Sequence, residues 1–296
     1  MLTPTLRAHL ECSAASAIVR LRDALYVVAD DSTRLHVYDL DGRPARPACP
    51  LLPDALPAEA RARKAVKPDL EMLTVLPDGG LLALGSGSTP RRTRAVRVPE
   101  VSTPERVSVI DASPLCAALG THLADLNLEG AACSGAALLL LQRGNGAAGR
   151  NALVRLDLAR VMDALTAGGP LTPDVLVEVL TVELGELPGG ALGFTDATLL
   201  PGDPAGDLLF TAVAEGGGST YEDGAFGGAV LGRLSARGEV RWIAPLEGPF
   251  KVEGLTATAR PEGGVDLYLV ADGDDPAVPA PLLSLSLSAA QLHRGA

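Results

Sequence analysis

The sequence predicts an all-β fold, a β-propeller of five four-stranded blades, and the first evidence for it is an internal repeat. Four segments share one order of features: a carboxylate, a short strand, a turn that contains glycine, and a second strand ending in small or polar residues. They read DLEMLTVLPDGGLLALGSGS, NLEGAACSGAALLLLQRGN, FTDATLLPGDPAGDLLFTAVAE and KVEGLTATARPEGGVDLYLVADG. Their carboxylates are Glu71, Glu129, Asp196 and Glu253, at intervals of 58, 67 and 57 residues. Strand-rich units repeated at such a spacing are typical of propellers.

The second observation is a fifth unit that precedes these four. The segment CSAASAIVRLRDALYVVADD has the same strand-turn-strand pattern, with Ser or Ala where the other units carry the acid. Five units divide the 296 residues into lengths close to the spacing of the carboxylates. We therefore expect a single five-bladed domain over residues 1–296. The alternative is a propeller of six blades, one of them degenerate.

Each unit also supplies a third strand, and most supply a fourth. The third strands are RLHVYDLDG, TRAVRVPE, NALVRLDLA, GAVLGRLSARG and PLLSLSLS, in which apolar and polar residues alternate with a period of two. Clear fourth strands are RVSVIDAS, VLVEVLTVEL and EVRWIAPL, whereas PLCAALGTHLADL and LARVMDALTAGG predict short helices. The last unit lacks a fourth strand, so we expect the N-terminal TPTLRAHLE to supply it and to close the ring, which removes exposed sheet edges.

Composition and charge exclude several classes of function. A net charge of −11 argues against a nucleic-acid partner, because such proteins need a basic surface. The N-terminal MLTPTLRAHLECSAASA lacks the pattern of a signal peptide, and the longest apolar run, GAALLLL, is too short to span a bilayer. We expect a soluble, cytoplasmic protein without a membrane partner. The excess of Arg, Gly and Pro indicates a bacterial source with a GC-rich genome.

The recurring acids form the candidate site. In a propeller the innermost strands line a central channel, so residues at equivalent positions of successive blades form a ring. This register places Glu71, Glu129, Asp196 and Glu253 around one axis, and small residues follow three of them. Carboxylates this close cannot all be ionised without compensation. A calcium ion bound by the four acids, neighbouring basic side chains, or shared protons would each supply it.

Basic residues flank the same ring. Two of the three lysines in the chain, Lys67 and Lys251, stand four and two residues before the acids of their units, and Arg143 ends the second strand of the third unit. We therefore expect these seven residues to form a mixed-charge site for a small polar ligand, an anion among the candidates, with or without a metal. The alternative is structural: an acid at a fixed position hydrogen-bonds the backbone of the neighbouring blade.

The motifs KPDLEMLTVLPDGGLLALGSGS, NLEGAACSG, GFTDATLLPG and KVEGL together resemble a bacterial β-propeller family of unknown function, over nearly the whole chain. That family is distantly similar to phytase-like (esterase-like) and gluconolactonase-type propellers. The resemblance implies acids at the channel mouth that bind calcium, and hydrolysis of a small ester, lactone or phosphoester. The first unit departs from this pattern because it lacks the acid.

Two functions follow from these observations. In a calcium-dependent hydrolase the ion would polarise the substrate, a free carboxylate would act as general base, and Lys67, Lys251 or Arg143 would hold the developing anion. In a non-enzymatic propeller, the loop-bearing face would bind a metabolite or a protein partner. The absence of a recognisable nucleophile motif leaves catalysis open, and binding is the reading we favour.

Overall fold

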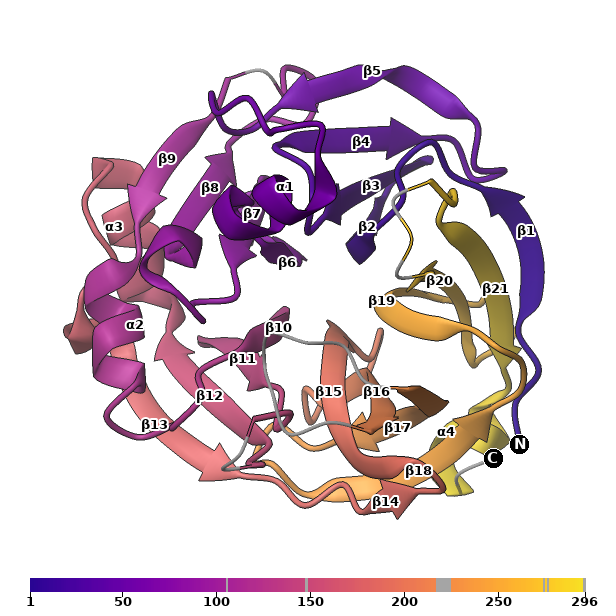
Figure 1. The fold of residues 1–296 in the computed structure, drawn as a ribbon. Coiled ribbons are helices and arrows are strands. Elements are labelled where there is room, and N and C mark those ends of the chain that lie inside the picture. Colours follow the sequence, from indigo (N-terminus) through magenta and orange to yellow (C-terminus); the bar gives the residue numbers. More distant parts are fainter. Residues whose placement is uncertain (105, 147–148, 217–224, 274, 276, 295–296) are drawn as a thin grey trace.

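The computed structural model is a closed ring of five antiparallel sheets, and it describes residues 1–104, 106–146, 149–216, 225–273, 275 and 277–294. The sheets surround a central axis as the blades of a propeller (Figure 1). Four sheets have four strands, and the fourth blade has one additional short strand. The predicted five-bladed propeller is therefore confirmed, and the six-blade alternative is excluded.

The innermost strand of each blade is followed along the chain by strands that pair outward in order. Blade one contains β2 (Ala15–Leu21), β3 (Ala24–Ala29), β4 (Arg34–Tyr38) and β5 (Pro44–Pro50). Blade two contains β6 (Leu70–Val75), β7 (Leu81–Gly85), β8 (Arg94–Val98) and β9 (Ser108–Asp111). Blade three contains β10 (Leu128–Ser134), β11 (Ala137–Gln142), β12 (Ala152–Asp157) and β13 (Leu176–Thr181). Blade four contains β15 (Gly190–Leu199), β16 (Leu208–Gly216), β17 (Ala225–Leu234) and β18 (Val240–Leu246), with β14 (Glu186–Leu187) paired to β15.

The fifth blade joins the two ends of the chain. It contains β19 (Lys251–Ala259), β20 (Val265–Asp272) and β21 (Pro281–Leu287), and its outermost strand is the N-terminal β1 (Thr5–His9). In the antiparallel pair, Thr5 lies opposite Ser284. The predicted closure by the N-terminal strand is confirmed, and Figure 1 shows the two termini side by side at this blade.

The cores of the protein lie between neighbouring blades. β11 shows this arrangement because its four leucines are all buried. Leu138 and Leu140 belong to a cluster with apolar residues of blade two, whereas Leu139 and Leu141 belong to a cluster with those of blade four. Successive residues of a strand point to opposite faces, so an uninterrupted apolar run fills both interfaces of a central strand.

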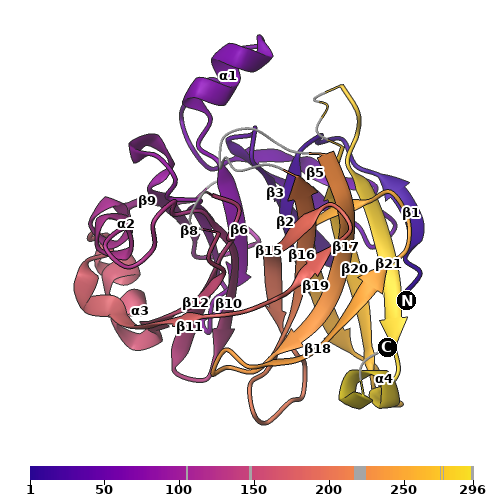
Figure 2. The same cartoon turned by 60° about the horizontal axis from the view of Figure 1, so that its bottom comes forward.

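Two helices confirm the prediction from the sequence. α2 (Ser113–Leu119) and α3 (Leu158–Ala167) lie together on the outside of the ring (Figures 1 and 2). The Asp157 side chain caps α3 by accepting a hydrogen bond from the Arg160 amide at 3.1 Å, and Gly168 ends the helix with φ of 66°. The face that α3 buries consists of Leu158, Val161 and Leu165.

The other helices were not predicted. They are α1 (Ala60–Val66), α4 (Ala289–Arg294) and the short 3-10 helices η1 (Pro90–Arg92) and η2 (Pro173–Val175). α1 lies between blades one and two along the chain, and its N-terminus is capped by Glu59, which accepts hydrogen bonds from the Arg61 and Ala62 amides. It projects from one end of the ring near the central opening (Figures 1 and 2). α1 therefore marks one mouth of the channel.

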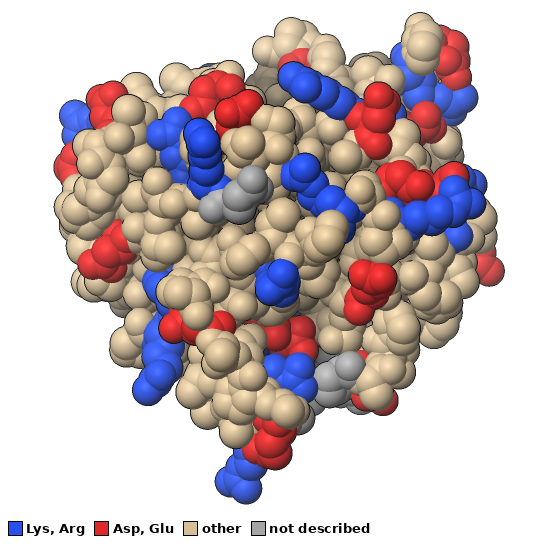
Figure 3. Space-filling view, turned by 90° about the horizontal axis from the view of Figure 1, so that it is seen from above, with Lys and Arg blue, Asp and Glu red and all other residues tan. Residues whose placement is uncertain are grey.

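The outer surface carries both signs of charge. Figure 3 shows acidic and basic side chains interspersed on one side of the molecule. None of the helices within the described residues is long and apolar enough to cross a membrane.

Candidate functional site

A β-bulge interrupts every innermost strand, within the first three residues in four blades and in the middle of β15 in blade four. In each case one residue of the innermost strand has no partner opposite it in the second strand, and the pairing register shifts there. The five bulged residues are Ser16, Glu71, Glu129, Thr195 and Glu253. A bulge leaves its extra residue outside the ladder and changes the direction of its side chain. Because the bulges occupy one position in the repeat, these residues form a level around the channel, which we call the bulge level. Three of its five members are glutamates.

A pocket at the α1 end of the channel, the mouth pocket, has about 80 Å³ of free space. Residues of α1 and of blades one, two, three and five line it, and most of them are charged. The carboxylates are Asp30, Asp69, Glu71, Glu129, Glu253 and Asp272, and the basic side chains are Lys64, Lys67, Arg92, Arg143 and Lys251. The opposite charges nearly balance, so the expected mixed-charge character is present in the described residues.

Arg143 connects three carboxylates on one side of this pocket. Its Nη2 lies 2.5 Å from Oε2 of Glu215, and its Nη1 lies 3.5 Å from Oε1 of Glu129 and 3.7 Å from Oε2 of Glu253. The Nζ of Lys251 lies 2.9 Å from Glu215 and 3.4 Å from Glu253. Two cations thus hold three acids from blades three, four and five.

The Arg143 side chain crosses toward blade four because that blade leaves room for it. A Cβ atom on Gly193 would lie 2.9 Å from Cγ of Arg143, so any larger residue there would displace the arginine. On the other side, Nδ2 of Asn127 donates to Oε1 of Glu129 at 2.5 Å. Burial raises the pKa of Glu129 to about 8, although the neighbouring Arg143 opposes that rise. Burial also raises the pKa of Glu253, against the effect of Lys251.

A second group of charges surrounds Asp69 in blade two. The Nζ of Lys67 bonds Asp30 and lies 2.9 Å from Oδ1 of Asp69. The other oxygen, Oδ2, accepts a hydrogen bond from Oγ of Ser86 at 2.6 Å and lies 2.8 Å from Nη1 of Arg92. Asp69 also has a φ of 56°, an uncommon conformation for a residue with a side chain. These contacts engage both oxygens of Asp69.

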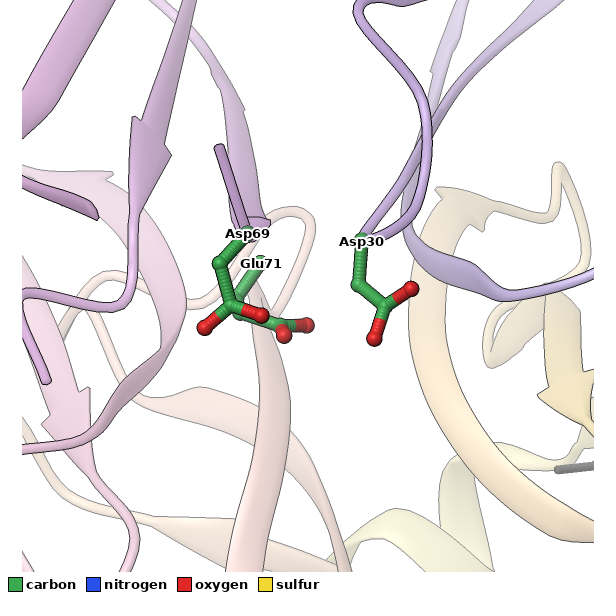
Figure 4. Close-up of side chains that lie close together, drawn as sticks. All are labelled: Asp30, Asp69 and Glu71. Carbon is green, nitrogen blue, oxygen red and sulfur yellow. The ribbon is translucent and has the colours of Figure 1, made fainter. Parts of the chain in front are cut away.

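Glu71 differs from the other acids of the pocket. Its carboxylate and those of Asp30 and Asp69 offer ligand atoms within 4.8 Å of one another, and Figure 4 shows the three groups directed into a shared space. No hydrogen bond or ion pair joins Glu71 to another residue in the described ranges. Burial, then the charges of Glu129 and Asp69, raise its pKa well above the usual value for glutamate. Within the part of the chain that the structure describes, nothing therefore uses Glu71 as a hydrogen-bond acceptor.

The structure separates Asp196 from the other predicted acids. It stands one residue beyond the bulge of its strand, and it does not line the mouth pocket. The residue is 1% exposed, and its side chain accepts hydrogen bonds from the amides of Ala197, at 2.7 Å, and of Leu255 in blade five, at 2.9 Å. Asp196 thus makes the contact with a neighbouring blade that the structural alternative describes. The other six predicted residues, Lys67, Glu71, Glu129, Arg143, Lys251 and Glu253, all line the pocket.

Some pocket residues have no counterpart in the sequence prediction. Asp69 and Asn127 stand two residues before a bulged glutamate, as the predicted Lys251 does, and Asp30 and Asp272 occupy equivalent positions at the end of a second strand. A search of the repeats for polar residues at these two positions would have found them. Glu215 could not have been found in this way, because it lies two residues beyond Val213, the residue of β16 that is equivalent to Asp30 and Asp272.

The donor set fits a calcium ion only in part. Oxygen ligands are present in Asp30, Asp69 and Glu71, and calcium requires six to eight of them. The ammonium group of Lys67, however, already contacts two of these three carboxylates. A cation at this place would have to displace the lysine.

Comparison with known proteins identifies the family. The family model described as a family of unknown function, DUF6929, matches residues 11–287, and the chain belongs to that family. This confirms the predicted membership in a propeller family of unknown function. A search of curated protein sequences found no significant match.

Solved structures share the fold at low identity. The catalytic domain of a Coprinopsis cinerea α-L-arabinofuranosidase is 10% identical, with 96% of each chain covered and a TM-score of 0.53. An endo-1,5-α-L-arabinanase of Thermotoga petrophila is 12% identical, with 95% of this chain and 72% of that chain covered and a TM-score of 0.51. Regucalcin of Agrobacterium tumefaciens, a calcium-binding protein, is 15% identical over 93% of this chain and 76% of that chain, with a TM-score of 0.43. At these identities the likeness extends to the fold alone.

Proposed function

We propose that the mouth pocket binds a small polar ligand, and that a hydrogen-bond donor or a cationic group of this ligand pairs with the carboxylate of Glu71. The observation that carries the proposal is the lack of any partner for this carboxylate among the described residues, in a pocket whose other acids are engaged. A partly buried acceptor without a donor is costly, and a ligand that supplies the donor removes the cost.

The pairing of the basic groups determines which ligands fit. Lys67, Arg92, Arg143 and Lys251 each contact at least one carboxylate of the protein. An anionic ligand would compete with these acids for each of these four of the five basic side chains in the pocket. A neutral or cationic group meets no such competition at Glu71, so we favour it over the anion considered from the sequence.

Calcium is the second candidate ligand, because Asp30, Asp69 and Glu71 lie within 4.8 Å of one another. Its binding would require Lys67 to move away from two of them, at the cost of both ion pairs. Hydrolysis of a small ester, lactone or phosphoester would depend on this rearrangement, since the ion would polarise the substrate. The small polar ligand needs no such movement.

Thermal unfolding and elemental analysis test the proposal. We would measure the melting temperature of the wild type with ethanolamine, D-glucose or calcium chloride, because a ligand selective for the native state must stabilise it. We expect ethanolamine or D-glucose to raise the melting temperature in the wild type and in the exposed control Glu183→Leu, but not in Glu71→Leu, which has no acceptor oxygen. An equal rise in Glu71→Leu would contradict the proposal. Near-stoichiometric calcium in the purified protein, lost in Glu71→Leu, would replace it with the second candidate.

A further inference from the structure

A second pocket adjoins the mouth pocket between blades three and four. This glycine pocket has about 230 Å³ of free space and is lined largely by glycines, among them Gly144, Gly190 and Gly193. Arg143 and Asn145 line both pockets, so one arginine side chain forms part of the boundary between them. The two spaces together reach the lower end of the range of roughly 300–1,000 Å³ for small-molecule sites.

Arg143 presents an unused donor at this boundary. Its side chain is 7% exposed, its Nη atoms face the carboxylates of Glu129, Glu215 and Glu253, and its Nε has no hydrogen-bond partner among the described residues. A Cβ on Gly193, which lines the glycine pocket, would lie 3.5 Å from this Nε. A buried N–H without an acceptor is uncommon in proteins and points to a bound partner.

The charge around this donor selects the chemistry of the partner. Arg143 and Lys251 already face three carboxylates, so a further anion gains little attraction there and a cation would be close to the guanidinium. An uncharged oxygen meets neither obstacle. At the other side of the mouth pocket, Glu71 requires a donor. A hydroxyl group both donates and accepts hydrogen bonds, and a compound with several hydroxyl groups satisfies both ends.

We propose that the two pockets together bind one uncharged polyhydroxyl compound of monosaccharide size. One hydroxyl group donates a hydrogen bond to Glu71, and another accepts one from Nε of Arg143. This assignment rests on the proposed function, since it names the class of ligand for the same site and extends that site into the glycine pocket.

The experiment compares neutral compounds with charged relatives. Binding of D-glucose, D-ribose and myo-inositol to the full chain would be measured by ligand-observed NMR, beside glucosamine, gluconate and glucose 6-phosphate. Two variants separate the pockets: Glu71→Leu removes the acceptor in the mouth pocket, and Ala191→Phe places a ring at the exposed edge of the glycine pocket. Ala45→Phe, on the exposed strand β5 of blade one, is the matched control for an added surface ring.

We expect at least one neutral polyol to bind more tightly than its charged relatives. Glu71→Leu and Ala191→Phe should each weaken that binding by about tenfold, the effect of one lost hydrogen bond or one obstructed contact, and Ala45→Phe should leave it unchanged. Binding that depends on Glu71 but not on Ala191 would overturn the extended site and leave the proposed function standing. Glu71-dependent binding of glucosamine alone would overturn the neutral class. If no compound binds the wild type, the polyhydroxyl class is overturned, and the measurement with ethanolamine decides the proposed function separately.

Discussion

Two acids one blade apart, Glu129 and Asp196, show how a shift of one residue separates a pocket side chain from a structural one. Both lie at or next to the bulge of an innermost strand, and both are buried, at 5% and 1% exposure. Glu129 is the bulged residue of β10 and faces Arg143 across the mouth pocket. Asp196 follows the bulge of β15 and accepts hydrogen bonds from two backbone amides. The position relative to the bulge, rather than the residue type, decides which role an acid has.

The rest of each blade agrees with this difference. Blade three has Arg143 at the end of its second strand, where the register of blade four places Val213. Thr195 takes the place of Glu129 and donates its hydroxyl hydrogen to the carbonyl oxygen of Val252 at 2.8 Å. Blade four therefore closes its part of the channel through hydrogen bonds within the protein, whereas blade three exposes charged groups to the pocket.

The largest effect is expected when blade three is changed into a copy of blade four. Arg143→Val leaves three buried carboxylates without their shared cation, and we expect it to lower the free energy of unfolding by about 4 kcal/mol. The double variant Arg143→Val/Glu129→Thr removes one of the orphaned acids and should recover at least about 1 kcal/mol. Urea unfolding measures both. A double variant that is less stable than Arg143→Val would show that Glu129 and Arg143 do not act as a pair.

Asp196→Ala tests the structural role of the second acid. It leaves the amides of Ala197 and Leu255 without an acceptor in a buried place, and we expect a loss of about 3 kcal/mol. Asp196→Asn retains one acceptor oxygen and should lose about half as much. Ligand binding at the mouth pocket should be the same in every folded variant. Weakened binding with unchanged stability would return Asp196 to the site.

Gly130→Ala tests the contact between the two blades. Gly130 follows Glu129, and a Cβ there would lie 2.8 Å from the amide nitrogen of Ala197 and 2.9 Å from Cα of Asp196. Because both atoms belong to the backbone of blade four, we expect a loss of about 2 kcal/mol in urea unfolding. The control is Gly169→Ala, where a Cβ would meet nothing within 4 Å. Equal stability of the two variants would mean that the blades can move apart without cost.

The repeat predicts the fold well because it depends on properties that the sequence displays directly. Blade number, the order of the strands and the closing N-terminal strand follow from alternation and spacing, and the structure has all three. The short helix α1 was not predicted. Its seven residues contain one apolar residue larger than alanine, Val66, so they lack the periodic apolar face that predicts a helix.

The site was harder to predict, because the sequence of a single strand does not show which of its residues forms a bulge. When the repeats are aligned by their acids, Asp196 is made equivalent to Glu129. This alignment is wrong by one residue, because the structure makes Thr195 equivalent to Glu129. The apolar residue before the bulge gives the better reference: Leu70, Leu128, Phe194 and Val252 are equivalent, and Thr195 then matches the three glutamates. The pairing of Lys67 with Asp30 joins parts of the chain 37 residues apart, and only the folded ring brings them together.

The smallest effect is expected for Glu129→Gln, and it concerns the dependence of stability on pH. The pKa of Glu129 is about 8 in the folded protein, against 4.5 for an ordinary glutamate. Between these values the folded state holds a proton that the unfolded state has released, so this group makes the protein less stable as pH rises from about 5 to 8. Glutamine does not titrate, and the variant should lose less stability over that interval, by at least about 1 kcal/mol.

Urea unfolding of the wild type, Glu129→Gln and the exposed control Glu183→Gln at pH 5 and pH 8 measures this difference. The control should have the same free energy of unfolding as the wild type at both pH values. The difference in free energy of unfolding between these two proteins and Glu129→Gln should be smallest at pH 5, where Glu129 carries its proton. If all three proteins lose the same stability between pH 5 and 8, Glu129 is ionised in the native protein at neutral pH. Arg143 and Lys251 would then balance three full negative charges, and the pocket would favour a cationic ligand over a neutral one.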